Sequence, residues 1–228
     1  MLKTEKKEDN SLRYEKKFVV LDYSEHETEM FVKSNKFLFR EIFEPRYVNN
    51  IYFDYMNFSS FFENIDGEHD REKTRIRWYG LDIKQADSPQ LEFKIKRGLL
   101  GSKEIYKMKN FNLDSNLENI VKNNDFDKRV FLKLTNQKPI LINRYKRKYF
   151  ISADKKFRIT IDTNLHFYFI AQNKLSLNKK ISDSGKIIVE LKYEKEYENQ
   201  AKQISSELPF RLSKNSKYLT GVNYMLNY

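Results

Sequence analysis

Basic side chains recur at every second position in several segments of the chain, as in Arg75 and Arg77. Alternate residues of a β-strand point to the same face of a sheet, so the charged residues of each segment share one face. Arginine binds phosphate through a bidentate fork of donors, and lysine binds it as a mobile point charge. We therefore expect a phosphate site. The charged faces comprise Arg13, Glu15 and Lys17; Arg75 and Arg77, with Arg71 and Lys73 upstream in phase; Glu92, Lys94 and Lys96; Arg158 and Asp162; Glu190 and Lys192; and Arg147 between Tyr145 and Tyr149.

Four carboxylates are interleaved with these basic residues, namely Glu15, Glu92, Asp162 and Glu190. A protein that only binds phosphate gains nothing from acidic groups in its site. Mg²⁺ or Mn²⁺ held by one or two carboxylates can bridge a protein to phosphate oxygens. The carboxylates therefore indicate a metal-assisted phosphate site.

The overall charge also indicates an anionic partner. The 228 residues include 43 Lys and Arg against 32 Asp and Glu, a formal net charge of +11. Such an excess suits nucleic acid, phosphate compounds or a membrane surface. Aromatic residues make up 15% of the chain, which is too many for a disordered protein. Cysteine is absent, so disulfides and thiolate metal sites are excluded and a reducing compartment is expected.

Several common motifs are missing. The glycines form no G-x-G-x-x-G or Walker A motif, no G-x-S-x-G occurs, and the three histidines are far apart. Gly98 and Gly101 instead predict a hairpin turn. No apolar run reaches the roughly 18 residues of a membrane helix. Residues 1–10 lack the apolar core of a signal peptide, and we expect them to form a disordered tail before one domain over residues 11–228.

Strands dominate the predicted elements. Two capping boxes, Ser24-x-x-Glu27 and Ser115-x-x-Glu118, predict helices over 24–40 and 115–124. Further helices are expected over 58–65, 196–207 and 216–226. The pattern indicates an α+β fold around an antiparallel sheet or barrel with flanking helices. Strands are predicted over 13–19, 49–54, 73–79, 91–96, 103–107, 140–150, 157–162 and 186–193, with 165–170 as a further candidate.

The basic ladders bear on the shape of this sheet. For one strand, a solvated polar face is the simplest explanation. On several strands of one flat sheet, adjacent like charges would repel one another, whereas faces that converge on a polyanion are stabilised by it. A closed sheet would place the charged faces in its lumen and the apolar faces, with Trp78 and Phe93, outside beneath helices. We therefore expect a barrel with a basic lumen.

In order and spacing, these segments resemble the VTC domain, the catalytic module of the vacuolar transporter chaperone polyphosphate polymerase, within the CYTH-like group of triphosphate tunnel enzymes. The resemblance covers about residues 11–221, and its most specific segment is Arg71-x-Lys73-x-Arg75-Ile76-Arg77-Trp78-Tyr79-Gly80. The other matching segments are 13–18, 52–54, 91–96, 145–150, 158–162, 189–193 and 214–218.

The resemblance implies an eight-stranded antiparallel tunnel barrel that moves the terminal phosphate of ATP onto polyphosphate with Mn²⁺ or Mg²⁺. In the catalytic role it implies, the phosphates are gripped by Lys17, Arg75, Arg77 and Arg147. Glu190 is the implied metal ligand, with Glu15 as a second candidate. Further phosphate-binding residues are expected at Lys94, Lys96, Lys103, Arg158, Lys192, Lys214, Ser216 and Lys217. Lys214, Ser216 and Lys217 stand at a predicted helix start, where anions are favoured.

One departure concerns the E-x-E-x-K signature of the wider group, in which Arg13 replaces the first Glu. Fewer carboxylates remain for a second metal, which argues against plain hydrolysis. Two alternatives stay open: a triphosphatase of the same fold, acting on inorganic or nucleoside triphosphates, and a non-catalytic polyanion binder. Nucleic acid is not expected as a partner, because the aromatic residues alternate on faces opposite the basic ones and a stacking platform needs both together.

The resemblance is to the stand-alone bacterial type of VTC domain, which implies a cytoplasmic protein with ATP and polyphosphate as its partners. Such versions often sit beside a membrane protein, so association with a membrane through that partner is a further expectation. The sequence sets neither the oligomeric state nor the choice between transfer and hydrolysis.

Overall fold

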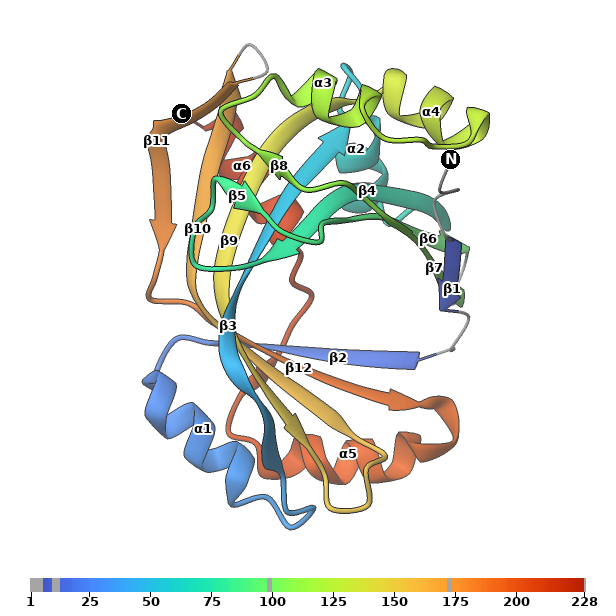
Figure 1. Cartoon of the computed structure of the whole chain (residues 1–228). Coiled ribbons are helices and arrows are strands. Elements are labelled where there is room, and N and C mark those ends of the chain that lie inside the picture. Colours follow the sequence, from blue (N-terminus) through green and yellow to red (C-terminus); the bar gives the residue numbers. More distant parts are fainter. Residues whose placement is uncertain (1–5, 10–12, 98–99, 172–173, 228) are drawn as a thin grey trace.

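Long antiparallel strands carry the charged ladders. The computed structural model describes residues 6–9, 13–97, 100–171 and 174–227, and within them the strands form an 11-stranded sheet in the order β1-β7-β6-β4-β3-β9-β10-β12-β2-β13, with β11 paired to β10 (Figure 1). The strands of this sheet are β1 Lys6–Asp9, β2 Arg13–Val20, β3 Arg40–Asp54, β4 Asp70–Tyr79, β6 Gln90–Arg97, β7 Leu100–Lys107, β9 Lys138–Ile151, β10 Arg158–Ala171, β11 Lys174–Asp183, β12 Ile187–Glu194 and β13 Arg211–Leu212. A small separate pair joins β5 (Gln85–Ala86) to β8 (Phe111–Asn112).

The sheet is strongly curved and open, so the prediction of a closed eight-stranded barrel was wrong (Figure 1). Closing the barrel would require β7 and β2 to pair with each other, but the free edge of each is already paired with a short strand. β7 pairs with β1, and β2 pairs with β13 through Val19 and Phe18. The curvature still brings the two parts of the sheet close together, because the Nζ atom of Lys94 on β6 lies 3.7 Å from Glu15 on β2.

Helices cover the convex face, as the apolar faces of the strands predict. One core joins α3 (Leu117–Lys122) and α4 (Lys128–Thr135) to the outer faces of β4 and β6, where Trp78 and Phe93 are fully buried. A second core joins α1 (Glu25–Lys33) and α5 (Glu198–Glu207) to β2, β10 and β12. A short 3₁₀ turn, η1 (Lys195–Tyr197), precedes α5.

The last helix, α6 (Lys217–Leu226), packs against residues of the concave face instead. A third core contains Tyr218 and Val222 of α6 together with Tyr145 and Phe167 of the sheet, and with α2 (Ser59–Asp66). Gly221 permits the close approach, because a Cβ atom there would lie 2.2 Å from the Cδ2 atom of Leu141. The first turn of α6 is thereby held over the concave charged face.

Some predicted boundaries differ from the structure. The capping box of Ser24 and Glu27 is confirmed, but the helix ends at Lys33 because the chain turns through Leu38, whose φ is +52°, into β3 at Arg40. Asn116, not Ser115, caps α3, since its side chain accepts a hydrogen bond from the Glu118 N–H. The predicted strands over 157–162 and 165–170 are one strand, β10, with a bulge.

Part of the expected N-terminal tail is a strand. Residues 6–9 form β1, which pairs with β7 and satisfies backbone groups that would otherwise lie at a sheet edge. Residues 1–5 and 10–12 lie outside the described residues, as do residues 98–99, where the hairpin turn was predicted. None of the described helices is long and apolar enough to cross a membrane.

Candidate active site

The concave face of the sheet and the start of α6 enclose a cavity of about 710 Å³. Its lining draws on β2, β4, β6, β9 and β12, and on the segment that leads into α6. Side chains from remote parts of the sequence therefore meet in one basic cavity. The predicted residues that line it are Glu15, Lys17, Arg75, Arg77, Lys94, Lys96, Arg147, Glu190, Lys192, Lys214, Ser216 and Lys217.

Two predicted phosphate-binding residues do not line this cavity. Lys103 on β7 is bonded to the buried carboxylate of Glu92. Arg158 has the inward phase of β10 but lies at the exposed start of that strand. Phase alone predicted both residues. Lys103 is on β7, beyond the strands that line the cavity, and binds Glu92, whereas Arg158 lies at the start of its strand.

The lining also contains basic residues that were not among the predicted site residues, chiefly Arg71 and Lys73. Both precede Arg75 in the same strand phase, so the period-two pattern could have identified them. Tyr145 also lines the cavity, although only its position two residues before Arg147 indicates this.

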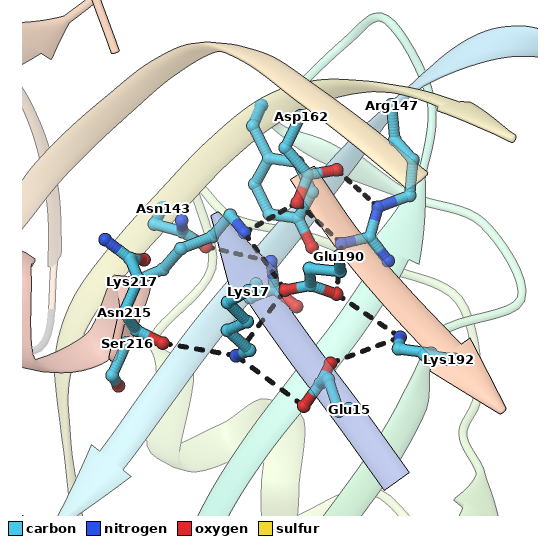
Figure 2. Close-up of polar contacts among 12 residues, drawn as sticks. Glu15, Lys17, Asn143, Arg147, Asp162, Glu190, Lys192, Asn215, Ser216 and Lys217 are labelled. Carbon is cyan, nitrogen blue, oxygen red and sulfur yellow. Dashed lines mark hydrogen bonds and ion pairs between the residues drawn. The ribbon is translucent and has the colours of Figure 1, made fainter. Parts of the chain in front are cut away.

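A buried cluster around Asp162 holds one side of the cavity (Figure 2). Arg147 donates two hydrogen bonds to this carboxylate, from Nε at 2.5 Å and from Nη2 at 2.6 Å. The Nζ atom of Lys217 lies 2.6 Å from Asp162 Oδ2. Burial would raise the pKa of Asp162, but Arg147 and Lys217 outweigh it and the pKa is lowered. The carboxylate therefore stays ionised and fixes both cations. We refer to these three residues as the Asp162 cluster.

The neighbours of Arg147 on β9, Lys146 and Lys148, point away from the cavity. The Nζ atom of Lys148 lies 2.5 Å from Glu29 Oε2 on α1, and that of Lys146 lies 3.7 Å from Glu25. Strand alternation therefore separates a cavity-facing arginine from two lysines that bind the outer helix.

Glu190 lies next to the Asp162 cluster and is surrounded by cations (Figure 2). Its carboxylate oxygens lie 3.3 Å from Lys192 Nζ, 3.5 Å from Lys17 Nζ and 3.7 Å from Lys217 Nζ. Arg147 Nη2 lies 3.4 Å away. Burial opposes ionisation, but these cations hold the pKa of Glu190 well below its usual range. Glu190 is therefore a permanent anion in a basic cavity.

Glu15 shares two of these cations, because β2 pairs with β12 so that Glu15 faces Lys192 and Lys17 faces Glu190. Its oxygens lie 3.7 Å from Lys17 Nζ and 3.6 Å from Lys192 Nζ. Burial and the nearby Glu190 oppose its ionisation, yet the surrounding lysines lower its pKa. The two predicted metal ligands thus stand as neighbouring carboxylates across one strand pair.

The donor set fits a divalent cation only in company with phosphate. Among the described residues, no group of three or more His, Cys, Asp or Glu side chains could hold a metal by itself. Glu190 and Glu15 supply two hard carboxylates, and Mg²⁺ commonly takes one or two carboxylates and completes its shell with water and phosphate oxygens. The other interleaved carboxylates are occupied: Asp162 by its cluster, and Glu92 by Arg75 at 2.5 Å and by Lys103.

The β4 and β6 side of the cavity differs from the Glu190 side. Arg77 donates to Asn50 Oδ1 at 2.9 Å and to the Tyr145 hydroxyl at 3.4 Å, and within the described residues it forms no ion pair. Lys73 donates to Ser216 Oγ at 3.0 Å. Burial, followed by the charges of Lys94 and Lys17, lowers the pKa of Lys73 to about 7. These cations repel one another, and a bound anion would reduce that repulsion.

The start of α6 completes this side. Ser216 is the N-cap of the helix and accepts a hydrogen bond from the Leu219 N–H at 3.4 Å. Lys17 reaches across from β2 to donate to the Asn215 carbonyl at 3.2 Å. The predicted helix start is confirmed, and its backbone donors face a cavity suited to anions.

Not all aromatic residues lie opposite the basic ones. Trp78 is buried in the outer core, as predicted. Tyr79 and Tyr149 instead share the strand phase of Arg77 and Arg147, and Tyr145 lines the cavity. The predicted separation of aromatic and basic faces was therefore wrong at the end of β4 and along β9.

Asp54, at the end of β3, has a structural role. Its carboxylate accepts hydrogen bonds from the backbone N–H groups of Ser60 and Phe61 in α2 and from the Tyr218 hydroxyl in α6. The side chain therefore joins two helices to the sheet and does not orient an arginine.

Comparison with known proteins agrees with this geometry. A family model described as the VTC domain matches residues 12–226 of the chain. A "putative adenylate cyclase" of Vibrio parahaemolyticus has a TM-score of 0.52 at 11% identity, over 96% of this chain and 100% of that one. PH1819 protein of Pyrococcus horikoshii has a TM-score of 0.50 at 16% identity, over 94% and 99% of the two chains. These identities support a shared fold alone. No curated protein matches the sequence.

Proposed function

Because the chain belongs to the VTC domain family, we propose that it is a metal-dependent phosphotransferase that moves the γ-phosphate of ATP onto the end of a polyphosphate chain. One observation carries the proposal: arginine and lysine make up most of the cavity lining, and among the described residues only Glu15 and Glu190 contribute acidic side chains to it. Polyphosphate and the triphosphate of ATP are anions of the same kind. A cavity of this composition therefore suits both donor and acceptor.

The reaction needs positioning and charge neutralisation more than covalent chemistry. A terminal oxygen of the polyphosphate forms a bond to the γ-phosphorus of ATP. The bond from that phosphorus to the β–γ bridging oxygen breaks, and ADP leaves with the electron pair. Arg77, which has no ion-pair partner among the described residues, is placed to donate to the transferring group. Glu92 holds Arg75, and Asp162 holds Arg147, in fixed positions beside it.

The remaining cations would distribute the phosphates along the cavity. Lys17 and Lys192 lie beside Glu15 and Glu190, and Lys94 of β6 approaches Glu15 at 3.7 Å. Lys214, Ser216 and Lys217 belong to the start of α6, where helix donors favour an anion. We propose these residues as the phosphate grip, with the oxygens of successive phosphates on successive side chains.

The ionised state of the carboxylates favours phosphate transfer over hydrolysis. The surrounding cations outweigh burial and lower the pKa values of all four inward carboxylates, which makes them weak bases. An attacking water must lose a proton, whereas a terminal phosphate oxygen is already ionised. A site with weak carboxylate bases therefore suits a phosphate acceptor better than water.

Glu190 and Glu15 are the residues that would hold Mn²⁺ or Mg²⁺ together with phosphate. Such an ion supplies neutralisation of charge on the phosphate oxygens. Glu190 remains ionised for this purpose because four cations surround it. We also propose that the protein acts in the cytoplasm and that it associates with a membrane through a membrane-protein partner.

The first experiment incubates the purified protein with ATP and Mn²⁺, separates the products on a gel stained for polyphosphate, and assays free phosphate in parallel. We expect a ladder of polyphosphate chains that Glu190→Gln reduces to background. Glu29→Gln is the matched control, because Glu29 also binds two lysines, Lys33 and Lys148, but on the outer helix α1. It should leave the ladder unchanged.

Other outcomes point to the alternatives. Free phosphate without chains indicates a triphosphatase. ATP or polyphosphate binding without either product, and with equal or tighter binding by Glu190→Gln, indicates a non-catalytic polyanion binder. Either result contradicts the polymerase.

A further inference from the structure

An arginine surrounded by aromatic rings lies beyond the cavity. The guanidinium carbon of Arg46 on β3 lies 4.9 Å from the ring centroids of Tyr79 and Tyr149 and 5.2 Å from that of Phe43. The rings of Phe43 and Tyr149 also meet edge to face, with centroids 5.7 Å apart. We refer to these four residues as the Arg46 platform. None of them has a role in the phosphate grip.

Strand geometry connects the platform to the phosphate grip. Tyr79 follows Arg77 by two residues on β4, and Tyr149 follows Arg147 by two residues on β9. Two residues along a strand span roughly 7 Å on one face. Arg46 itself pairs with Arg147 across β3 and β9. The platform therefore continues the charged face by about the length of one ribose.

Electrostatic contacts agree with this placement. Burial and the nearby Tyr79 raise the pKa of Tyr149 to about 12, while Arg147 and Arg46 act in the opposite direction. The Tyr149 hydroxyl therefore interacts electrostatically with Tyr79 and Arg46 of the platform and with Arg147, which lines the cavity.

The platform is accessible, unlike the aromatic residues of the cores. Phe43 is 53% exposed and Tyr79 is 40% exposed, whereas the adjacent Trp78 is fully buried. Arg46 is exposed as well. Tyr149 is half-buried. An exposed tyrosine ring and an arginine plane beside a phosphate site are groups on which nucleobases stack.

We propose that the Arg46 platform binds the nucleobase of a nucleoside triphosphate whose phosphates lie in the cavity. The proposal rests on the proposed function, since it requires the cavity to bind a triphosphate. A polyphosphate chain has no ring to stack. The platform therefore distinguishes the phosphate donor from the acceptor and orients the donor with its γ-phosphate toward the cavity interior.

The opposite face of the same strands provides a control. There the guanidinium carbon of Arg144 on β9 lies 4.1 Å from the ring centroid of Tyr47 on β3. This pair has the same chemistry as the platform but lies on the face that points away from the cavity, because both residues have the outward strand phase.

The test measures dissociation constants by isothermal titration calorimetry for ATP and for inorganic tripolyphosphate, which has no base. The proteins are the wild type, Tyr79→Ala, Tyr79→Phe and Tyr47→Ala, each checked for folding by circular dichroism. We expect Tyr79→Ala to weaken ATP binding by about tenfold and to leave tripolyphosphate binding within about twofold. Tyr79→Phe retains the ring and should bind both ligands like the wild type, as should Tyr47→Ala.

The outcomes separate the two proposals. Equal loss of both ligands in Tyr79→Ala, or no loss of either, overturns the nucleobase site while leaving the phosphate cavity in place. Wild-type protein that binds neither ligand overturns the proposed function. A wild type that binds tripolyphosphate, combined with an ATP-selective loss in Tyr79→Ala alone, supports both.

Discussion

The two sides of the basic cavity use their cations differently. On the β9, β10, β12 and β2 side, buried carboxylates bind the cations, as Asp162 binds Arg147 and Lys217. On the β4 and β6 side, Glu92 binds Arg75 in the same way, but Lys73 and Arg77 have only neutral partners among the described residues. Arg71, Lys96 and Lys214, also on this side, likewise form no ion pair within the described residues.

This difference indicates that paired cations have a structural role and unpaired cations a binding role. Paired cations have a fixed geometry and lose little when no ligand is present, so they build the wall of the cavity. Unpaired cations repel one another, and an anion would reduce that repulsion, so these residues would supply the driving force for the proposed phosphate binding. The lowered pKa of Lys73, which burial and then the charges of Lys94 and Lys17 cause, agrees with this division.

The largest effect is expected on stability, from the paired side. Asp162→Asn removes the closest anion of the buried Arg147 and Lys217 and leaves them only the more distant Glu190, which should lower the free energy of unfolding by about 3–5 kcal/mol. Urea denaturation measures this change. Glu29→Gln, which breaks ion pairs on the outer helix α1, should cost less than about 1 kcal/mol. Equal losses in the two variants would contradict the division into two sides.

The next effect is on turnover, from the other side. Arg77→Gln removes a charged donor from the cavity, but its amide can still bind Asn50. We expect turnover to fall by about 10²–10³-fold while the urea midpoint stays close to that of the wild type, because no buried anion is left unpaired. If turnover stayed close to that of the wild type, or if stability fell as in Asp162→Asn, Arg77 would have the structural role of the paired cations instead.

The smallest effect is a pH dependence. Lys73 has a pKa of about 7 in the free protein, and a bound polyanion favours its charged form. Tripolyphosphate affinity should therefore fall as the pH rises above 7, by at most about tenfold per pH unit from this group. Lys73→Met should lose that part of the slope, so that the affinities of the two proteins converge as the pH rises.

The comparison between these two proteins cancels the titration of the ligand and that of Lys103, whose pKa burial lowers to about 8. Calorimetric titrations at several pH values provide the measurement. Parallel slopes in wild type and Lys73→Met would show that Lys73 does not take up the proton.

Much of the site could be predicted from the period of two in the strands. The pattern identified Lys17, Arg77 and Arg147, which all line the cavity. It erred where position along a strand decides the outcome, as for Arg158, which lies at an exposed strand start. It also suggested a closed barrel, because nothing in a local pattern reveals that β1 and β13 pair with the strands that would close it.

The sequence by itself determined the α+β class, the basic character of the inward strand faces and the residues that share each strand face. These properties depend on neighbours along the chain, where backbone geometry alone sets the side-chain direction. Only the tertiary structure decided which cations are paired. Asp162 meets Lys217 from α6, and Glu190 meets Lys17 from β2. Such contacts depend on strand register, on sheet curvature and on the position of α6 against the sheet, which all arise from packing between distant segments.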